Sequence, residues 1–322
     1  MKRGSWFGLV LIAGLFSAGL VADSTVLADD VLLVVGAPGD EEYGREFERW
    51  KERWKTIAKV ADFDLSIVGP GGDTRNGDDR DALEAEITKR LDGGDPLWLL
   101  FVGHGTWDGV SARFNLVGPD VSARDLAKWL RPAKRPLVLV NCSSSSGPFV
   151  DRLSGPGRVV VTATKSGSEQ NFARFGGYFA EAIANPDSDL DHDDAVSVRE
   201  AFLKAASATG VFYQQEGRIA TEHAMIDDNG DKKGTRVELL RGKKTLKGEG
   251  KIDGDLAGRI TIPVNPDAPK LTKEQKAERD QLETQLRKLG RQGLSVDALR
   301  QQALPILKQL AELYRQAEAA SK

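Results

Sequence analysis

Two reactive side chains stand directly after apolar runs of strand length. His104 follows the run Leu97–Gly103, and Cys142 follows RPLVLVN. In an open α/β sheet the working residues gather at the carboxyl ends of neighbouring strands. The separation of 38 positions (142 − 104) fits one strand–helix–strand crossover. A thiol beside an imidazole can act as an activated nucleophile. The pattern therefore predicts a Cys–His dyad at adjacent strand ends.

Each residue also has a simpler interpretation. A lone cysteine after an apolar strand is often a buried small hydrophobe, and a histidine between glycines can be an ordinary loop residue. The chain has one cysteine, which excludes an internal disulfide, so the combination of both residues at strand ends favours chemistry. Gly105 lets the backbone approach a substrate closely, and we predict that its N–H joins that of Cys142 in an oxyanion hole.

Length and composition limit the remaining classes of function. The 322 residues suffice for one substantial core and an accessory element. With a net charge of −3 and no long basic block, the chain has no signature of a nucleic-acid-binding protein. Three histidines and one cysteine also argue against a zinc centre.

The first residues resemble a targeting segment. Lys2 and Arg3 precede an uncharged apolar run from Trp6 to Val21, and Val26-Leu27-Ala28 fits a signal-peptidase site. The run is short for a membrane span. We expect residues 1–28 to be a signal peptide and the mature protein to be exported, periplasmic or secreted, without membrane attachment.

Apolar runs alternate with helical periodicity over the first two thirds of the chain, which predicts a mainly parallel sheet covered on both faces, an α/β/α sandwich. The expected strands are 30–36, 63–68, 97–103, 137–140 and 158–164, and the expected helices are 41–61, 81–91, 121–130, 149–153 and 172–184.

Four segments are expected: a signal peptide (1–28), an α/β domain (29–226), a polar extension (227–268) and a helical hairpin (269–322). The hairpin begins with a capping box, Thr272 with Gln275, and Pro305 is expected to kink its second arm. We interpret the hairpin as coiled-coil-like and as a surface for self-association.

One acidic stretch matches a calcium-loop template. Asp189, Asp191, Asp193, Ser197 and Glu200 occupy positions 1, 3, 5, 9 and 12. Position 6 is aspartate instead of the usual glycine, so a solvated acidic loop is the alternative. We interpret Asp227, Asn229 and Asp231 as a truncated version of the pattern. Structural calcium is the one ion expected, and no cofactor is required.

These features together resemble a known family. An apolar strand, His-Gly, a second apolar strand and cysteine are similar to the caspase-like clan of cysteine peptidases, and within it to the legumain family. The segments VVVTATKSGSEQN and APGDEEYGREF also resemble parts of that family. The resemblance spans roughly residues 30 to 225. It implies a caspase-like fold and a peptide or protein substrate.

The resemblance also implies roles. His104 would protonate the leaving amine, Cys142 would be the nucleophile and Gly105 would supply an oxyanion N–H. Three residues would form walls of the specificity pocket: Arg45, Ser166 and Glu169.

The chain departs from its relatives beside the nucleophile. Val140 and Asn141 replace residues that legumains and metacaspases use there, so neither asparagine nor basic specificity is implied. We predict an exported cysteine endopeptidase acting through an acyl-enzyme. The alternatives are a transpeptidase or ligase using the same dyad, a catalytically inactive binding module of the same fold, and a calcium-stabilised structural protein.

Overall fold

The computed structural model describes residues 30–72, 78–241, 252–265, 271–290 and 292–320. The expected signal peptide, residues 1–28, lies outside the described residues, so its prediction stays untested. Within the described ranges, none of the helices combines the length and the apolar character that crossing a bilayer requires.

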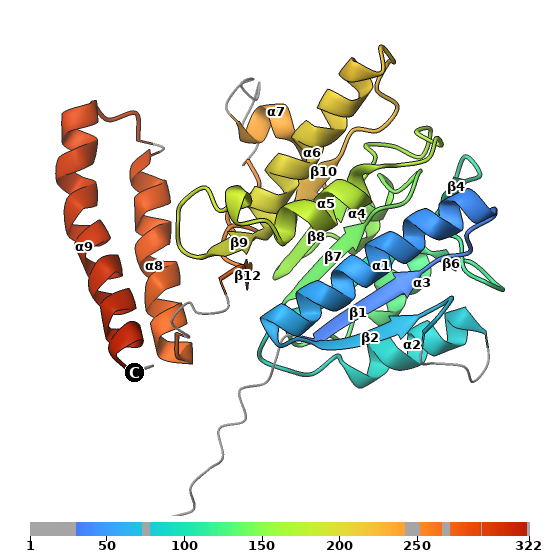
Figure 1. Cartoon of the computed structure of the whole chain (residues 1–322), viewed down its shortest axis with the longest axis horizontal. Coiled ribbons are helices and arrows are strands. Elements are labelled where there is room, and N and C mark those ends of the chain that lie inside the picture. The colour runs from blue at the N-terminus through green and yellow to red at the C-terminus, as the bar shows by residue number, and fades with distance from the viewer. Residues whose placement is uncertain (1–29, 73–77, 242–251, 266–270, 291, 321–322) are drawn as a thin grey trace, which may run out of the picture.

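A seven-stranded sheet forms the centre of the molecule (Figure 1). The strand order is β11-β10-β8-β7-β3-β1-β2. The five strands from β2 to β8 in this order run parallel, whereas β10 pairs antiparallel with β8 and β11 antiparallel with β10. The strands are β1 (Asp30–Val35), β2 (Asp64–Val68), β3 (Leu97–Val102), β7 (Leu137–Asn141), β8 (Arg158–Thr162), β10 (Met225–Asp227) and β11 (Thr235–Arg236).

Helices cover both faces of this sheet, and each face has its own hydrophobic core. One face carries α1 (Glu41–Ala61), α5 (Phe175–Ile183) and α6 (Val198–Gln215), and the other carries α2 (Asp79–Lys89), α3 (Ala123–Trp129) and α4 (Phe149–Leu153). The three-layer α/β/α sandwich with a mainly parallel sheet, predicted from the sequence, is confirmed.

Local sequence explains the central elements. All six residues of β3 are buried, as expected for a parallel strand covered on both faces. In α1, Phe47, Trp50 and Trp54 form the predicted buried stripe, and the Asp40 side chain accepts a hydrogen bond from the Tyr43 N–H at the start of the helix.

The α/β domain continues past residue 226, where the sequence analysis placed its end. Both β10 and β11 belong to the central sheet, and β12 (Thr261–Pro263) pairs with β9 (Ala195–Ser197). The segment 227–268 therefore contributes strands to the domain. Its elements, which include α7 (Val237–Leu240), have two to four residues each and are too short to show a period in the sequence.

The C-terminal hairpin is present as predicted. Helices α8 (Lys273–Gly290) and α9 (Val296–Ala320) pack side by side, with Pro305 inside α9 (Figure 1). Thr272 and Gln275 form the expected reciprocal hydrogen bonds at the start of α8. Leu282 on α8 and Leu313 on α9 are buried.

Candidate active site

Strands β3 and β7 are neighbours and end at the same edge of the sheet. Phe101 pairs with Asn141, and the Cys142 N–H donates to the Phe101 carbonyl at 2.9 Å. His104 follows the end of β3 by two residues. The backbone thus brings the two predicted dyad residues to one edge, as the strand-end argument requires.

The two strand-end loops are joined by Gly105. Its N–H donates to Ser144 Oγ at 3.3 Å, and Ser144 Oγ donates to the Gly105 carbonyl at 3.0 Å. A Cβ at Gly105 would lie 2.2 Å from the Ser144 carbonyl oxygen, so only glycine fits. The predicted oxyanion donor is therefore engaged with Ser144.

Chain direction changes immediately after His104. Gly105 begins β4 (Gly105–Trp107), which forms a small antiparallel sheet with β5 (Ala112–Phe114) and β6 (Val121–Ser122). The Asn115 N–H donates to the His104 carbonyl at 3.0 Å, which fixes the histidine backbone. These three short strands are not among the strands expected from the sequence.

The His104 ring lies in an aromatic cluster. Its centroid is 4.7 Å from that of Tyr43 and 5.1 Å from that of Phe47, both edge-on, and 6.0 Å from that of Phe172. His104 Nε2 lies 3.1 Å from the Pro38 carbonyl oxygen. These contacts hold the ring against α1 and the loop that precedes it.

The Cys142 thiol is buried, with 3% of the residue exposed. It faces the first turn of α5: a Cβ placed at Gly176 would lie 3.0 Å from Cys142 Sγ and 2.8 Å from the Trp50 ring. Within the described residues no hydrogen bond joins Cys142 to His104. Burial, and secondarily the Glu222 carboxylate, raises the pKa of the Cys142 thiol to about 12.

Glu222 is a site residue that the sequence did not reveal. It is 3% exposed, and its carboxylate accepts hydrogen bonds from the backbone N–H groups of Arg174 and Phe175 at the start of α5. Burial raises the pKa of the Glu222 carboxyl, against the effect of these donors. Its position in a polar segment without periodicity carries no signal of this contact.

The predicted pocket residues lie in two places. Ser166 and Glu169 are in the loop between β8 and α5, and the Glu169 carbonyl accepts from the Ser145 N–H at 2.8 Å, so this loop is bound to the serine loop after Cys142. The Glu169 carboxylate pairs with His223. Arg45 is on the exposed side of α1, where it pairs with Glu41.

Two surface hollows of the described chain lie away from this edge. One is on the hairpin beside Leu313, and the other is between α3 and the loop after α4. Neither includes His104 or Cys142. At the strand-end site itself the Cys142 thiol is buried, whereas His104 is partly exposed.

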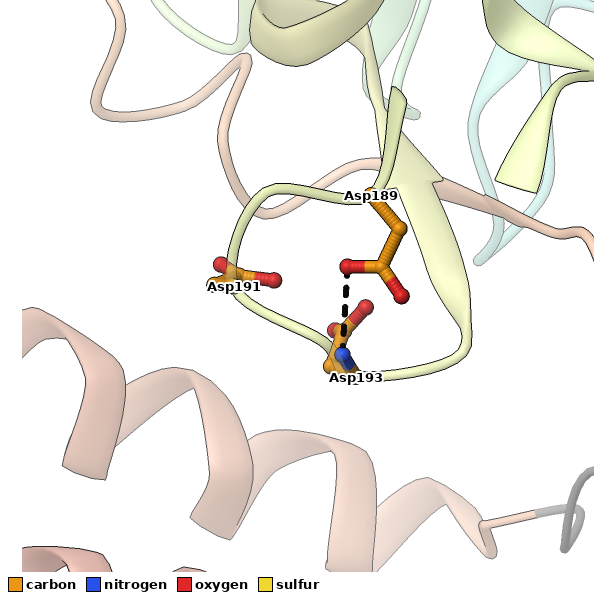
Figure 2. Close-up of side chains that lie close together, drawn as sticks. All are labelled: Asp189, Asp191 and Asp193. Carbon is orange, nitrogen blue, oxygen red and sulfur yellow. Dashed lines mark hydrogen bonds between the residues drawn. The ribbon is translucent and has the colours of Figure 1, made fainter. Parts of the chain in front are cut away.

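The predicted calcium ligands form a second cluster (Figure 2). Ligand atoms of Asp189, Asp191 and Asp193 lie within 4.8 Å of one another. Burial, and then the Asp191 charge, raises the pKa of Asp193 to about 7. The fourth predicted ligand, Glu200, is directed to backbone: its carboxylate accepts from the N–H groups of Leu190 and Ser197.

Comparison with known proteins shows distant similarity. No protein-family model matches the chain. No curated protein matches it either. Among solved structures, the Drosophila initiator caspase Dronc is similar at 15% identity and a TM-score of 0.42, covering 71% of this chain and 95% of that one. Caspase-1 from Spodoptera frugiperda is similar at 8% identity and a TM-score of 0.41, covering 63% and 87%. Both similarities are weak, so the function is argued from the residues of this chain.

Proposed function

We propose that this protein is a cysteine endopeptidase of the legumain-like kind, with Cys142 as nucleophile and His104 as general acid and base. The supporting observation is the placement of both residues at the ends of adjacent parallel strands. Their loops are bound together through Gly105 and Ser144. The expected export of the protein belongs to the same proposal.

The reaction follows from the two functional groups. The Cys142 thiolate attacks the peptide carbonyl carbon, and His104 holds the thiol proton. The C–N bond breaks as His104 returns this proton to the leaving amine. Water then hydrolyses the thioester and releases the acid and the free thiol. An amine in place of water would instead form a new peptide bond, the transpeptidase or ligase outcome.

The burial of the Cys142 thiol sets a condition for this activity. A substrate carbonyl needs the Cys142 thiol exposed and the Gly105 N–H released from Ser144. The covering groups are the first turn of α5 and Phe172 of the preceding loop, whose ring stacks on Trp50 with centroids 6.0 Å apart. We propose that substrate binding displaces the loop between β8 and α5. Ser166 and Glu169 of this loop would then border the bound peptide, with Arg45 contributing from α1.

The burial of the Cys142 thiol supports a second candidate function, a non-catalytic binding module of this fold. A fully buried thiol with a raised pKa is a poor nucleophile, because the thiolate is the reactive form. In that case Cys142 would serve as a core residue. The two candidates predict opposite results with a thiol-reactive peptide probe.

The deciding experiment is cleavage profiling on a diverse peptide library under reducing conditions. We expect the wild type to cleave, Cys142→Ala to lose cleavage and His104→Ala to be strongly impaired. His192→Asn is the matched histidine control, because His192 is exposed and asparagine tolerates its left-handed backbone. Equal cleavage by the wild type and Cys142→Ala would refute the nucleophile. Absence of both cleavage and probe labelling would favour the binding module.

Structural calcium at Asp189, Asp191 and Asp193 is also a proposal. The three carboxylates lie close together, and oxygen ligands suit calcium. Asp194 takes the left-handed conformation, with φ of 64°, that glycine usually supplies at position 6. A calcium-dependent rise in melting temperature that Asp191→Asn reduces would support it.

A further inference from the structure

A second loop, residues 227–238, has the same spacing of oxygen-bearing side chains as the acidic loop at 189–200. Counting from Asp227 as position 1 places Asn229, Asp231 and Thr235 at positions 3, 5 and 9. Glu238 stands at position 12 (227 + 11), the place of the closing glutamate. The prediction of a truncated pattern is therefore wrong, since Glu238 occupies the twelfth position.

The two loops agree in backbone conformation. Positions 4 and 6 have positive φ in both: 59° and 64° at His192 and Asp194, and 78° and 66° at Gly230 and Lys232. In both, a short strand and then a helix follow, β9 and α6 in the first and β11 and α7 in the second. The carboxylate at position 1 accepts the N–H of position 4 in each.

The second loop contains a buried carboxylate oxygen without a partner. Asp227 is fully buried, and its Oδ1 accepts from Gly230 N–H and from Ser154 Oγ–H. Its Oδ2 is buried and accepts no hydrogen bond of normal geometry. Because Oδ1 is bound to Gly230 of the loop, this carboxylate is directed toward the loop. Buried carboxylate oxygens are normally satisfied by donors or by metal ions.

A second oxygen of the same set is also unsatisfied. Glu238 Oε2 is buried and accepts no hydrogen bond. It forms an ion pair with the Arg236 guanidinium, whose Nε lies 3.8 Å away. Position 1, the first ligand of a calcium loop, thus carries an oxygen that accepts no hydrogen bond. Position 12, the bidentate ligand, carries one whose printed contact is the long ion pair with Arg236, which a bound cation would replace.

Two further buried carboxylates next to the loop also favour a bound cation. Asp228 is 7% exposed and Asp253 is 2% exposed. The Asp253 carboxylate accepts from the N–H groups of Asp228 and Asn229, and the Asp228 carboxylate accepts from Gly254 and Ala257 N–H. Across the described ranges, no basic side chain forms an ion pair with Asp227, Asp228 or Asp253. These carboxylates give the loop a surplus of buried negative charge, which a bound cation would offset.

We propose that residues 227–238 form a calcium-binding loop, with oxygen ligands from Asp227, Asn229, Asp231 and Glu238. Backbone and side-chain oxygens of intermediate positions complete such a site. The loop joins β10 to β11 and α7 at the end of the central sheet (Figure 1). A bound ion would fasten this edge of the domain and neutralise its buried charge.

The test uses the full chain after removal of metal by a chelator, titrated with calcium chloride in a calorimeter. The background variant is Asp191→Asn, which weakens the first loop. We expect this variant to bind one calcium ion, and Asp191→Asn with Glu238→Gln to lose that binding. Glu216→Gln on the same background is the matched control, because Glu216 is exposed at the end of α6 outside both loops.

Folding is checked by the melting temperature in chelator, which we expect to be the same for all three variants because Glu238 and Glu216 are not core residues. Calcium should raise the melting temperature of the control and leave that of the Glu238 variant unchanged. Equal calcium uptake with and without Glu238, or no uptake by the Asp191→Asn background, would overturn the proposal. Equal affinity for magnesium would overturn the choice of calcium, since magnesium prefers a smaller octahedral site.

Discussion

Gly105 and Ser144 bind each other through two hydrogen bonds, and this pair holds the histidine loop on the cysteine loop. The close approach depends on the absence of a side chain at Gly105, because an added Cβ would meet the Ser144 carbonyl oxygen at 2.2 Å. The relative position of His104 and Cys142 therefore depends on a glycine as well as on the strand order.

The first prediction concerns this contact. Gly105→Ala should destabilise the protein by about 1–3 kcal/mol, since the buried loops must move apart to admit a methyl group. Chemical denaturation measures the loss in free energy of unfolding. Gly210→Ala is the control, because a Cβ there meets nothing within 4 Å and alanine stabilises a helix by roughly 0.5–1 kcal/mol relative to glycine. A Gly105→Ala protein as stable as the wild type would show that the two loops are not tightly packed.

The second prediction concerns pH. The pKa of the Cys142 thiol is raised to about 12 in the folded protein from an ordinary value of 9.0. The unfolded chain therefore loses this proton first, and the folded state binds more protons between these values. The contribution of the thiol to stability is complete below pH 9 and is lost as the pH rises toward 12.

Urea unfolding at several pH values tests this linkage, from pH 8.5 to pH 11, which is roughly one unit below the pKa of the thiol in the folded protein. The free energy of unfolding should fall more steeply with pH in the wild type than in Cys142→Ala. Tyrosines with raised pKa values, such as Tyr213, titrate in both proteins and cancel in the comparison. Identical slopes would mean that the Cys142 pKa is not raised by folding.

The third prediction concerns Glu222, whose charge contributes to the raised Cys142 pKa. Glu222→Gln keeps an acceptor for the Arg174 and Phe175 N–H groups but removes the charge. The pH midpoint for alkylation of the Cys142 thiol should therefore move downward. Glu181→Gln on the exposed side of α5 should leave it unchanged. An unchanged midpoint in a folded Glu222→Gln protein would leave burial as the whole cause.

The fourth prediction concerns the hairpin. Leu313 is 4% exposed, so Leu313→Ala should cost about 2–5 kcal/mol of hairpin stability. Leu307 on the same helix is 49% exposed, and Leu307→Ala should change stability by less than about 0.5 kcal/mol. Thermal unfolding followed by helical circular dichroism measures both. Equal effects of the two substitutions would mean that α9 does not pack through Leu313.

The sequence predicted the elements that have a strong period. The expected α1 and α4 have the observed bounds. The five predicted parallel strands are all present, and β1 and β3 are the clearest of them because they are long apolar runs. The strands β4, β5 and β6 have two or three residues each and were missed. Strands this short have no measurable alternation, and their pairing is set by distant segments.

The site was predictable only in part. The apolar runs predict the strands, and the observed pairing of β3 with β7 places His104 and Cys142 at one edge. The direction of each side chain is set by residues remote in sequence: Phe172 lies beside His104, and Gly176 beside Cys142. No local pattern encodes these contacts, so the sequence could not decide between an exposed nucleophile and a buried thiol.

The order of strands in the sheet has a consequence for synthesis on the ribosome. The three neighbouring strands β1, β2 and β3 are complete in the chain once residue 102 has been made, and β7, β8, β10 and β11 lie beyond β3 in the order in which they are made. Domains commonly fold while the chain elongates from its N-terminus. The nascent chain can thus extend one growing edge of the sheet, with the strand before His104 made before the strand that precedes Cys142.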